Sequence, residues 1–146
     1  MPKWAILATV AAVVACAVFA LLKAWPTINI VETGKTPEYP DVVPRQYPTS
    51  KDRAFDAALH AVGRMPRWTL VSSRPEQGGI QAEVTTRLFR FVDDVTIHCV
   101  EQNGITAVTV RSASRVGRGD FGQNARNIRA FFDALDRQLG DRTGHS

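Results

Sequence analysis

The stretch that decides the fold runs from Val92 to Ser114 and reads VDDVTIHCVEQNGITAVTVRSAS. At its centre, Asn103 and Gly104 both tolerate the positive φ of a type I′ turn, and alternating residues on either side favour strands. The pattern predicts a hairpin of two antiparallel strands over 92–101 and 105–114. A two-residue loop pairs Gln102 with Ile105, so the register of the whole hairpin follows from the turn.

This register divides the hairpin into two faces. One face is apolar and should be covered by helices: it pairs Cys99 with Val108, Ile97 with Val110 and Val95 with Ser112. On the other face, Asp94 lies diagonal to Arg111 and Arg115, within reach of long side chains. Asp93 points to the helix side, opposite Ser114. The two aspartates therefore diverge and cannot act as a catalytic dyad.

Helical and strand patterns flank the hairpin. The spacing predicts a helix over 51–63, capped by Thr49 or Ser50, and strands over 68–73 and 80–87. A final helix is predicted to start at Asp120 as N-cap, with Gln123 completing an approximate capping box. Its core-facing stripe consists of Phe121, Ala125, Ile128, Phe132, Leu135 and Leu139. We therefore predict an α+β domain, in the order helix, four antiparallel strands, helix, with both helices on one face of the sheet.

The chain opens with an apolar segment. Residues 4–22 carry no charge, and as a helix they would span roughly 28 Å, close to the hydrocarbon thickness of a bilayer. Lys3 and Lys23 bracket this segment. The pattern predicts that residues 1–25 form a transmembrane anchor and that residues 4–22 contact the membrane.

Two alternatives to a retained anchor stay open. Ala15-Cys16-Ala17 offers small residues for signal-peptidase cleavage. Val13-Val14-Ala15-Cys16 also fits a permissive lipoprotein cleavage pattern, with lipidation at Cys16. The residues that follow Cys16 are still apolar, which favours the anchor. We expect a single pass through the bacterial cytoplasmic (inner) membrane, with the soluble domain in the periplasm.

Composition sets the rest of the organisation. Five of the eight prolines lie in residues 26–48, which predicts an extended Pro-rich linker whose second half lies along the domain. The α+β globular domain is expected over 49–140, followed by a frayed tail at 141–146.

The net charge of +4 is too small to favour nucleic-acid binding. The scattered histidines and the two cysteines predict neither a metal site nor a cofactor.

A polar corner follows the hairpin, where residues 111–124 read RSASRVGRGDFGQN. The candidate ligand-binding residues are Arg111, Arg115, Asp94 and Asn124, and the residues expected to form a structural polar joint are Asp93, Ser112, Ser114, Asp120 and Gln123. In a structural interpretation, Asp94 neutralises the arginines and Asp120 caps the final helix. In a functional interpretation, the arginines and the amides at the start of that helix hold a phosphate, carboxylate or anionic headgroup.

Two motifs carry a resemblance to a known family. Residues 85–94, TTRLFRFVDD, and residues 110–124, VRSASRVGRGDFGQN, resemble the uncharacterised bacterial and plastid proteins of domain-of-unknown-function family 1499. The resemblance covers roughly residues 36–139, and Tyr39-Pro40-Asp41 with Trp68 looks like a membrane-anchored bacterial branch. It implies one α+β domain in an envelope or lumenal setting, and it assigns no activity.

Three functional hypotheses follow from the sequence. The first is a non-catalytic, membrane-anchored envelope domain that binds a protein partner or a small anion through the Arg111, Arg115 and Asp94 face. The second is a purely structural or assembly tether. The third is a carboxylate-dependent hydrolase or isomerase using Asp93 or Asp94, although the chain lacks a nucleophile–histidine pairing and a metal set. We therefore predict no catalytic residues.

Overall fold

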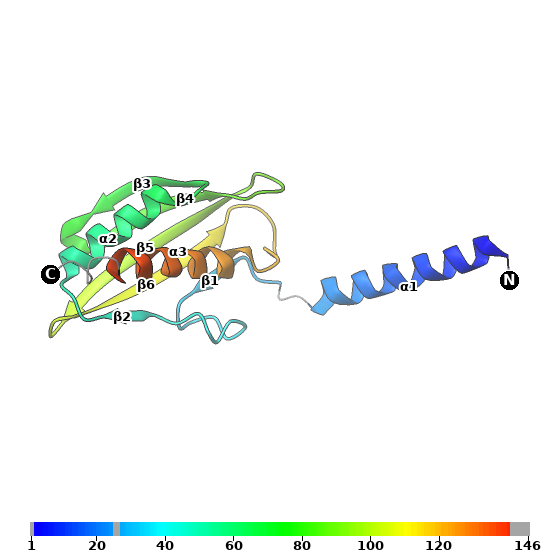
Figure 1. The fold of residues 1–146 in the computed structure, drawn as a ribbon, viewed down its shortest axis with the longest axis horizontal. Helices are drawn as coiled ribbons and strands as arrows, with labels where there is room; N and C mark the ends of the chain where they lie inside the picture. The colour runs from blue at the N-terminus through cyan, green and yellow to red at the C-terminus, as the bar shows by residue number, and fades with distance from the viewer. Residues whose placement is uncertain (1, 25–26, 141–146) are drawn as a thin grey trace.

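The computed structural model describes residues 2–24 and 27–140, so the predicted tail at 141–146 lies outside the described residues. In Figure 1, α2 and α3 lie together on one face of a single sheet, and α1 extends away from the domain. The elements are α1 (Lys3–Ala24), β1 (Ile30–Glu32), β2 (Arg45–Tyr47), α2 (Lys51–Arg64), β3 (Trp68–Arg74), the short 3₁₀ helix η1 (Pro75–Gln77), β4 (Gly79–Thr85), β5 (Val92–Gln102), β6 (Ile105–Ser114) and α3 (Gln123–Gly140). This arrangement confirms the predicted α+β fold.

The sheet has six strands, in the order β1-β6-β5-β4-β3, with β2 also paired to β6. All paired neighbours are antiparallel. The two strands beyond the predicted four are β1 and β2, which occupy the same outer edge of β6 through pairs such as Val31 with Ser112 and Gln46 with Ala107. Both are only three residues long and lie in a proline-rich segment, which is why strand periodicity did not reveal them.

The predicted hairpin register is confirmed along its length. Gln102 pairs with Ile105, and the same register continues outward to Asp93 opposite Ser114. Asn103 and Gly104 take positive φ values of 53° and 75°, as a type I′ turn requires. The turn residues therefore place Asp93 on the helix-covered face and Asp94 on the open face.

The core lies between the sheet and the two helices. Ser50 caps α2 by accepting a hydrogen bond from the backbone amide of Arg53 at 3.3 Å. Phe131 of α3 is fully buried and stacks on Trp68 of β3, with ring centroids 6.2 Å apart. The other large buried side chains include Ile80, Ile97, Ile128 and Leu135. The buried stripe of α3 is thus wider than predicted, because it includes Phe131.

The start of α3 differs from the prediction. Phe121 and Gly122 both take positive φ values, of 50° and 77°, and the helix begins only at Gln123. Two left-handed residues between the cap and the helix remove Phe121 from the helical stripe, and its side chain is 56% exposed. Asp120 still caps, since its carboxylate accepts from the amides of Gly122 at 2.9 Å and Asn124 at 2.6 Å. The Gln123 side chain donates to Asn127 and does not complete a capping box.

The segment predicted as a linker is bound to the domain at several points. Arg129 of α3 donates two hydrogen bonds to Asp41, at 2.8 and 2.9 Å. Asp136 accepts from Tyr47 at 2.7 Å and from Arg45. These contacts hold residues 41–47 along α3, beside the edge strands.

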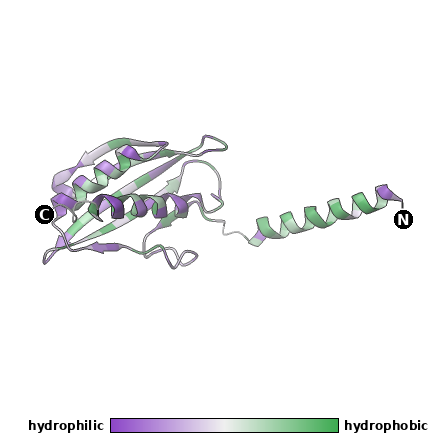
Figure 2. Ribbon diagram, viewed as in Figure 1, coloured by the Kyte–Doolittle hydropathy of each residue, from purple (hydrophilic) through white to green (hydrophobic). Residues whose placement is uncertain are grey.

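α1 is long and apolar enough to cross a membrane, and none of its residues is buried in the protein. Figure 2 shows that hydrophobic residues run along its whole length, whereas hydrophilic residues recur along α3. A signal sequence near an N-terminus would pass the same test of length and composition.

Candidate functional site

A buried network of polar side chains joins the start of α3 to the sheet. Ser112 donates to Asn124 Oδ1 at 2.6 Å, and Asn124 Nδ2 donates to Ser114 Oγ at 2.9 Å. Asn127 Nδ2 donates to Asp93 Oδ2 at 2.8 Å and to Ser112 Oγ at 3.2 Å. Ser112 and Asn124 are fully buried, so these bonds satisfy groups that have no access to water.

The network also holds the segment that follows α1. The carbonyl of Asn29 accepts from Asn124 Nδ2 at 2.9 Å and from the Ser114 amide at 2.8 Å. The Asn29 side chain in turn donates to the Gly117 carbonyl at 2.9 Å, and the Asp120 amide donates to the Ile28 carbonyl at 3.2 Å. Residues 28–29 are therefore fixed directly to the loop between β6 and α3.

Asp93 is the titratable member of this network and is only 1% exposed. Desolvation raises the pKa of its carboxyl above the ordinary value of 3.8, and the negative charges of Asp120 and Asp94 act in the same direction. Hydrogen bonds from Asn127 and Ser114 oppose this effect. The neutral form of the Asp93 carboxyl is therefore more strongly favoured in the folded protein than in water.

On the open face of the sheet, Arg115 forms an ion pair with two carboxylates. Its guanidinium donates to Asp94 at 2.9 and 2.6 Å and also to Glu83 of β4. Hydrogen bonds to Asp94 and Glu83 raise the pKa of Arg115. The contact between Arg115 and Asp94 was predicted from the hairpin register. Glu83 was not, because the sequence gives no register for β4 against β5.

Two of the four predicted ligand-binding residues, Arg115 and Asp94, come together, and the other two do not join them. Arg111 lies on the open face, directly between Glu32 of β1 and Thr96 of β5, and forms no salt bridge or side-chain hydrogen bond within the described residues. Asn124 is in the first turn of α3, on the opposite side of the sheet, and belongs to the buried network. Because Glu83 adds a second carboxylate beside Arg115, the open face also has less excess positive charge than the two arginines alone suggest.

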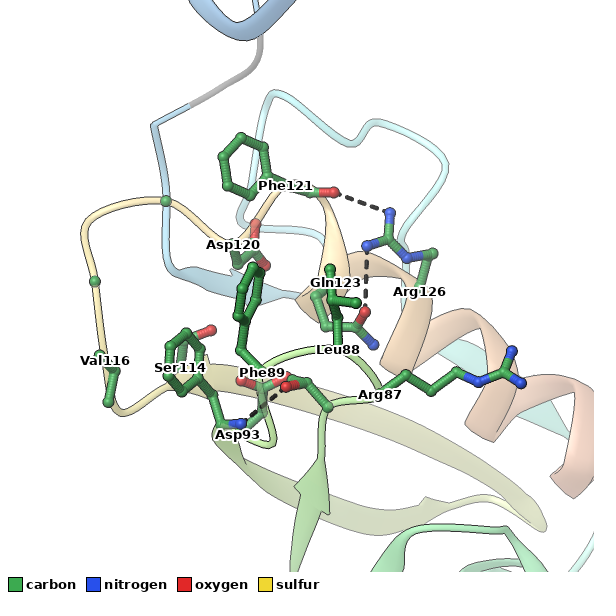
Figure 3. A pocket seen from close by; sticks show the side chains of 14 residues that line it. Arg87, Leu88, Phe89, Asp93, Ser114, Val116, Asp120, Phe121, Gln123 and Arg126 are labelled. Carbon is green, nitrogen blue, oxygen red and sulfur yellow. Dashed lines mark hydrogen bonds between the residues drawn. The ribbon is translucent and has the colours of Figure 1, made fainter.

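A pocket of about 430 Å³ lies at the end of the sheet where β5 begins and β6 ends. Two loops surround it, residues 86–91 between β4 and β5 and residues 115–121 between β6 and α3, which we call the rim loops. Leu88, Phe89, Val116 and Phe121 from these loops lie around the pocket, with Asp93 and Ser114 at its base (Figure 3). Asp93 is the one buried residue of the lining. The pocket thus combines apolar walls with a desolvated carboxyl.

Local bonds shape the first rim loop. The Thr86 amide donates to the Phe91 carbonyl at 2.7 Å, and the Phe91 amide donates to Thr86 Oγ1 at 2.9 Å. Arg90 takes a positive φ of 53°, which turns the chain back toward β5. The rings of Phe89 and Phe91 stack with centroids 5.5 Å apart.

Sequence reasoning missed this pocket, although it had singled out several of its residues. Asp93, Ser114, Asp120 and Gln123 were expected to form only a structural joint, and residues 86–87 were assigned to a strand. The available signal was the run Leu88-Phe89-Arg90-Phe91, which places three large apolar residues between strands with no sheet face to cover. Among the described residues, no three His, Cys, Asp or Glu side chains come together in a way that could hold a metal ion.

The fold and the pocket define an α+β domain that follows an apolar helix. The family described as "Protein of unknown function (DUF1499)" matches residues 20–135, and the chain belongs to this family. The match includes both rim loops and every residue of the buried network.

Two further comparisons add little. No curated protein matches the chain. The crystal structure of a Thermus thermophilus protein, TTHA0849, is similar at 9% sequence identity and a TM-score of 0.42, covering 80% of this chain and 99% of that one. A likeness at this level supports no conclusion about fold or function.

Proposed function

We propose that this domain binds a small amphipathic molecule in the pocket between the rim loops. The observation that carries the proposal is a cavity of about 430 Å³ with apolar walls over the buried carboxyl of Asp93. Small-molecule sites are typically concave and mainly apolar, with a few polar groups that fix orientation. A ligand with one hydrogen-bonding group and an apolar body fits this chemistry. The polar group would reach Asp93, and the apolar body would pack against Phe89, Phe91 and Leu88.

The electrostatics of Asp93 support a ligand with a neutral polar group. An anionic group facing Asp93 would add to the negative charges of Asp94 and Asp120, which already raise its pKa. An alcohol can donate to the ionised carboxyl and accept from the neutral one. The position facing Asp93 therefore favours a neutral polar group, such as the hydroxyl of a long-chain alcohol, over a carboxylate.

Photo-crosslinking of the full chain in lipid nanodiscs tests this proposal. The probe is decanol carrying a diazirine on its chain, and the adducts are mapped by peptide mass spectrometry. We expect adducts concentrated on residues 86–91 and 114–121, with at least a threefold lower yield for Phe91→Ala. Val100→Ala is the matched control, because Val100 is an apolar side chain, 62% exposed, in the other half of β5.

A second probe separates specific binding from simple partitioning. The diazirine analogue of decane has the same chain without the hydroxyl group, so it cannot hydrogen bond to Asp93. Stronger labelling by the alcohol supports the pocket. Equal labelling by both probes, or adducts spread over the chain, would contradict it.

The open face of the sheet offers a second candidate, which is binding of a small anion or a partner through Arg111, Arg115 and Asp94. The observation that favours it is the partly buried Arg111, which has no ionic partner among the described side chains. Titration with inorganic phosphate, followed by NMR, is the direct test. We expect Arg111→Ala to remove any binding, and Arg115→Ala to change it less because Arg115 is held by two carboxylates. Unchanged spectra in phosphate would contradict the binding of a small phosphate-like anion at this face.

We further propose that α1 is retained as a single-pass anchor in the inner membrane, with the domain in the periplasm. The absence of charge over residues 4–22 supports the anchor. The intact mass of the chain purified from membranes tests retention, since cleavage near Ala17 or lipidation at Cys16 would change the mass. A maleimide reagent that does not cross the membrane, applied to cells with a cysteine at position 105, tests orientation.

A further inference from the structure

The largest exposed apolar side chains of the domain gather at one place. Eleven large hydrophobic residues after α1 are exposed in the described part of the chain, and five of them lie on the two rim loops. These five are Leu88 (81% exposed), Phe89 (67%), Phe91 (44%), Val116 (54%) and Phe121 (56%). Every exposed phenylalanine of the described domain is in this group. Contiguous apolar surface of this kind marks an interaction site.

The same loops are basic. Arg87, Arg90, Arg115 and Arg118 lie on them, against a single acidic residue, Asp120, whose carboxylate is engaged by backbone amides. Arg115 is paired on the open face, but Arg87, Arg90 and Arg118 form no salt bridge within the described residues. Aromatic and leucine side chains mixed with arginine are typical of segments that lie at a membrane interface.

The chain itself places these loops near the end of α1. α1 ends at Ala24, and the carbonyl of Ile28 already accepts a hydrogen bond from Asp120 of the second rim loop. Four residue steps separate these positions, and they can span about 15 Å at most. The Asn29 side chain bonds to Gly117 of the same loop, so the loop cannot move away from the connection.

A bilayer has headgroup regions of roughly 5–7 Å on each side of its hydrocarbon core. If α1 spans that core, Ile28 lies within or just above the headgroups, and the rim loops lie beside it. The hairpin turn at Asn103-Gly104 lies at the other end of β5, about 34 Å away at roughly 3.4 Å per residue. Figure 1 shows the rim loops at the end of the domain where α1 is attached and the hairpin turn at the far end.

We propose that the rim loops dock on the lipid bilayer that α1 spans, with Leu88, Phe89 and Phe121 inserted among the headgroups and the arginines facing lipid phosphates. This surface requires α1 to be in the membrane. It does not require a ligand in the pocket, so the two proposals can fail separately. A second membrane protein is a less favoured occupant, because the short connection already supplies a lipid surface at the loops.

Site-directed fluorescence in proteoliposomes tests the docking. The full chain with Cys16→Ala is reconstituted in phosphatidylcholine and phosphatidylglycerol at about 7:3, and the dye NBD is attached to Leu88→Cys. The native Cys99 is buried and does not compete for the reagent. Ile105→Cys is the matched control, because Ile105 is an exposed apolar residue beside the distant turn. Quenching by lipids with a doxyl group near the headgroup reports contact with the bilayer.

We expect a blue-shifted emission and at least threefold stronger quenching for the label at position 88 than for the label at 105. A Phe121→Cys label provides a second reporter on the other rim loop, and it should behave like position 88. Adding Phe89→Asp to the Leu88→Cys chain should reduce the quenching, while the circular dichroism melting curve shows that the domain is still folded. Equal quenching of the labels at positions 88 and 105 would overturn the proposal. Shielding of position 88 from solvent in native membranes but not in these vesicles would also overturn it, because lipid alone would then not cover the loop.

Discussion

Asn124→Ala is the substitution that most directly measures the buried network. Asn124 is fully buried, and its amide makes three hydrogen bonds, to Ser112 at 2.6 Å, to Ser114 at 2.9 Å and to the Asn29 carbonyl at 2.9 Å. A buried hydrogen bond contributes roughly 1 kcal/mol net. Three of them predict a loss of about 3 kcal/mol in the free energy of unfolding. The Asn29 carbonyl keeps the amide of Ser114 as a donor, which limits the loss. The Ser112 hydroxyl still accepts from Asn127 but has lost its own acceptor, which adds to the loss.

Chemical and thermal unfolding of the full chain, followed by circular dichroism, measures this loss. For a domain of this size, about 3 kcal/mol corresponds to a decrease in Tm on the order of 12 °C. Gln46→Ala is the matched control, because it removes an exposed amide from β2 and should change stability by less than about 0.5 kcal/mol. A loss below about 1 kcal/mol for Asn124→Ala would refute the reasoning, since water or a shifted neighbour would then be replacing the amide.

Three further predictions concern titration and exposure. The pKa of Asp93 is raised in the folded protein, so the stability that Asp93 contributes should be lost as pH rises from about 4 through its folded-state pKa. Asp93→Asn should not show this loss, so its stability relative to the wild-type protein should increase over that pH range. Parallel pH profiles of Tm for the two proteins would contradict this prediction. Arg115→Ala leaves the carboxylates of Glu83 and Asp94 opposite each other, so it should lower Tm slightly at low salt. This decrease should vanish in molar NaCl, because salt screens the repulsion. A large decrease that does not depend on salt would indicate a packing role for Arg115. Burial raises the pKa of Cys99 to about 11, so its thiol should resist iodoacetamide at pH 8 in the folded chain and react after unfolding in urea, as mass spectrometry can show.

The hairpin was predictable in detail because one turn fixes it. Asn103-Gly104 sets the register, and the register then places Asp93, Asp94 and Arg115 on their observed faces. The helix boundaries were predictable to within a few residues from caps and apolar spacing. Phe121 was misassigned because it matches the stripe in spacing, but the positive φ at Phe121 and Gly122 breaks the helical period before the helix begins.

Other features depend on contacts that a local pattern does not encode. Glu83 reaches Arg115 only because β4 pairs with β5 in one particular register, and no tight turn connects those strands. The strands β1 and β2 are three residues each and are stabilised by the edge of β6. The pocket forms where two loops distant in sequence meet, so its apolar residues looked like unrelated loop positions. The division of Arg111 and Asn124 between two faces likewise follows from the position of α3 on the sheet.

The pairing of β1 and β2 with β6 has a practical consequence for anyone who expresses this domain alone. A recombinant fragment that begins at residue 49 would lack both edge strands, together with the buried side chains of Val31 and Val42. It would leave the outer edge of β6 without its strand partners over residues 106–108 and 111–113. Exposed edges of this kind recruit strands from other molecules. Such a fragment should form aggregates, whereas one that begins at residue 27 keeps the edge closed.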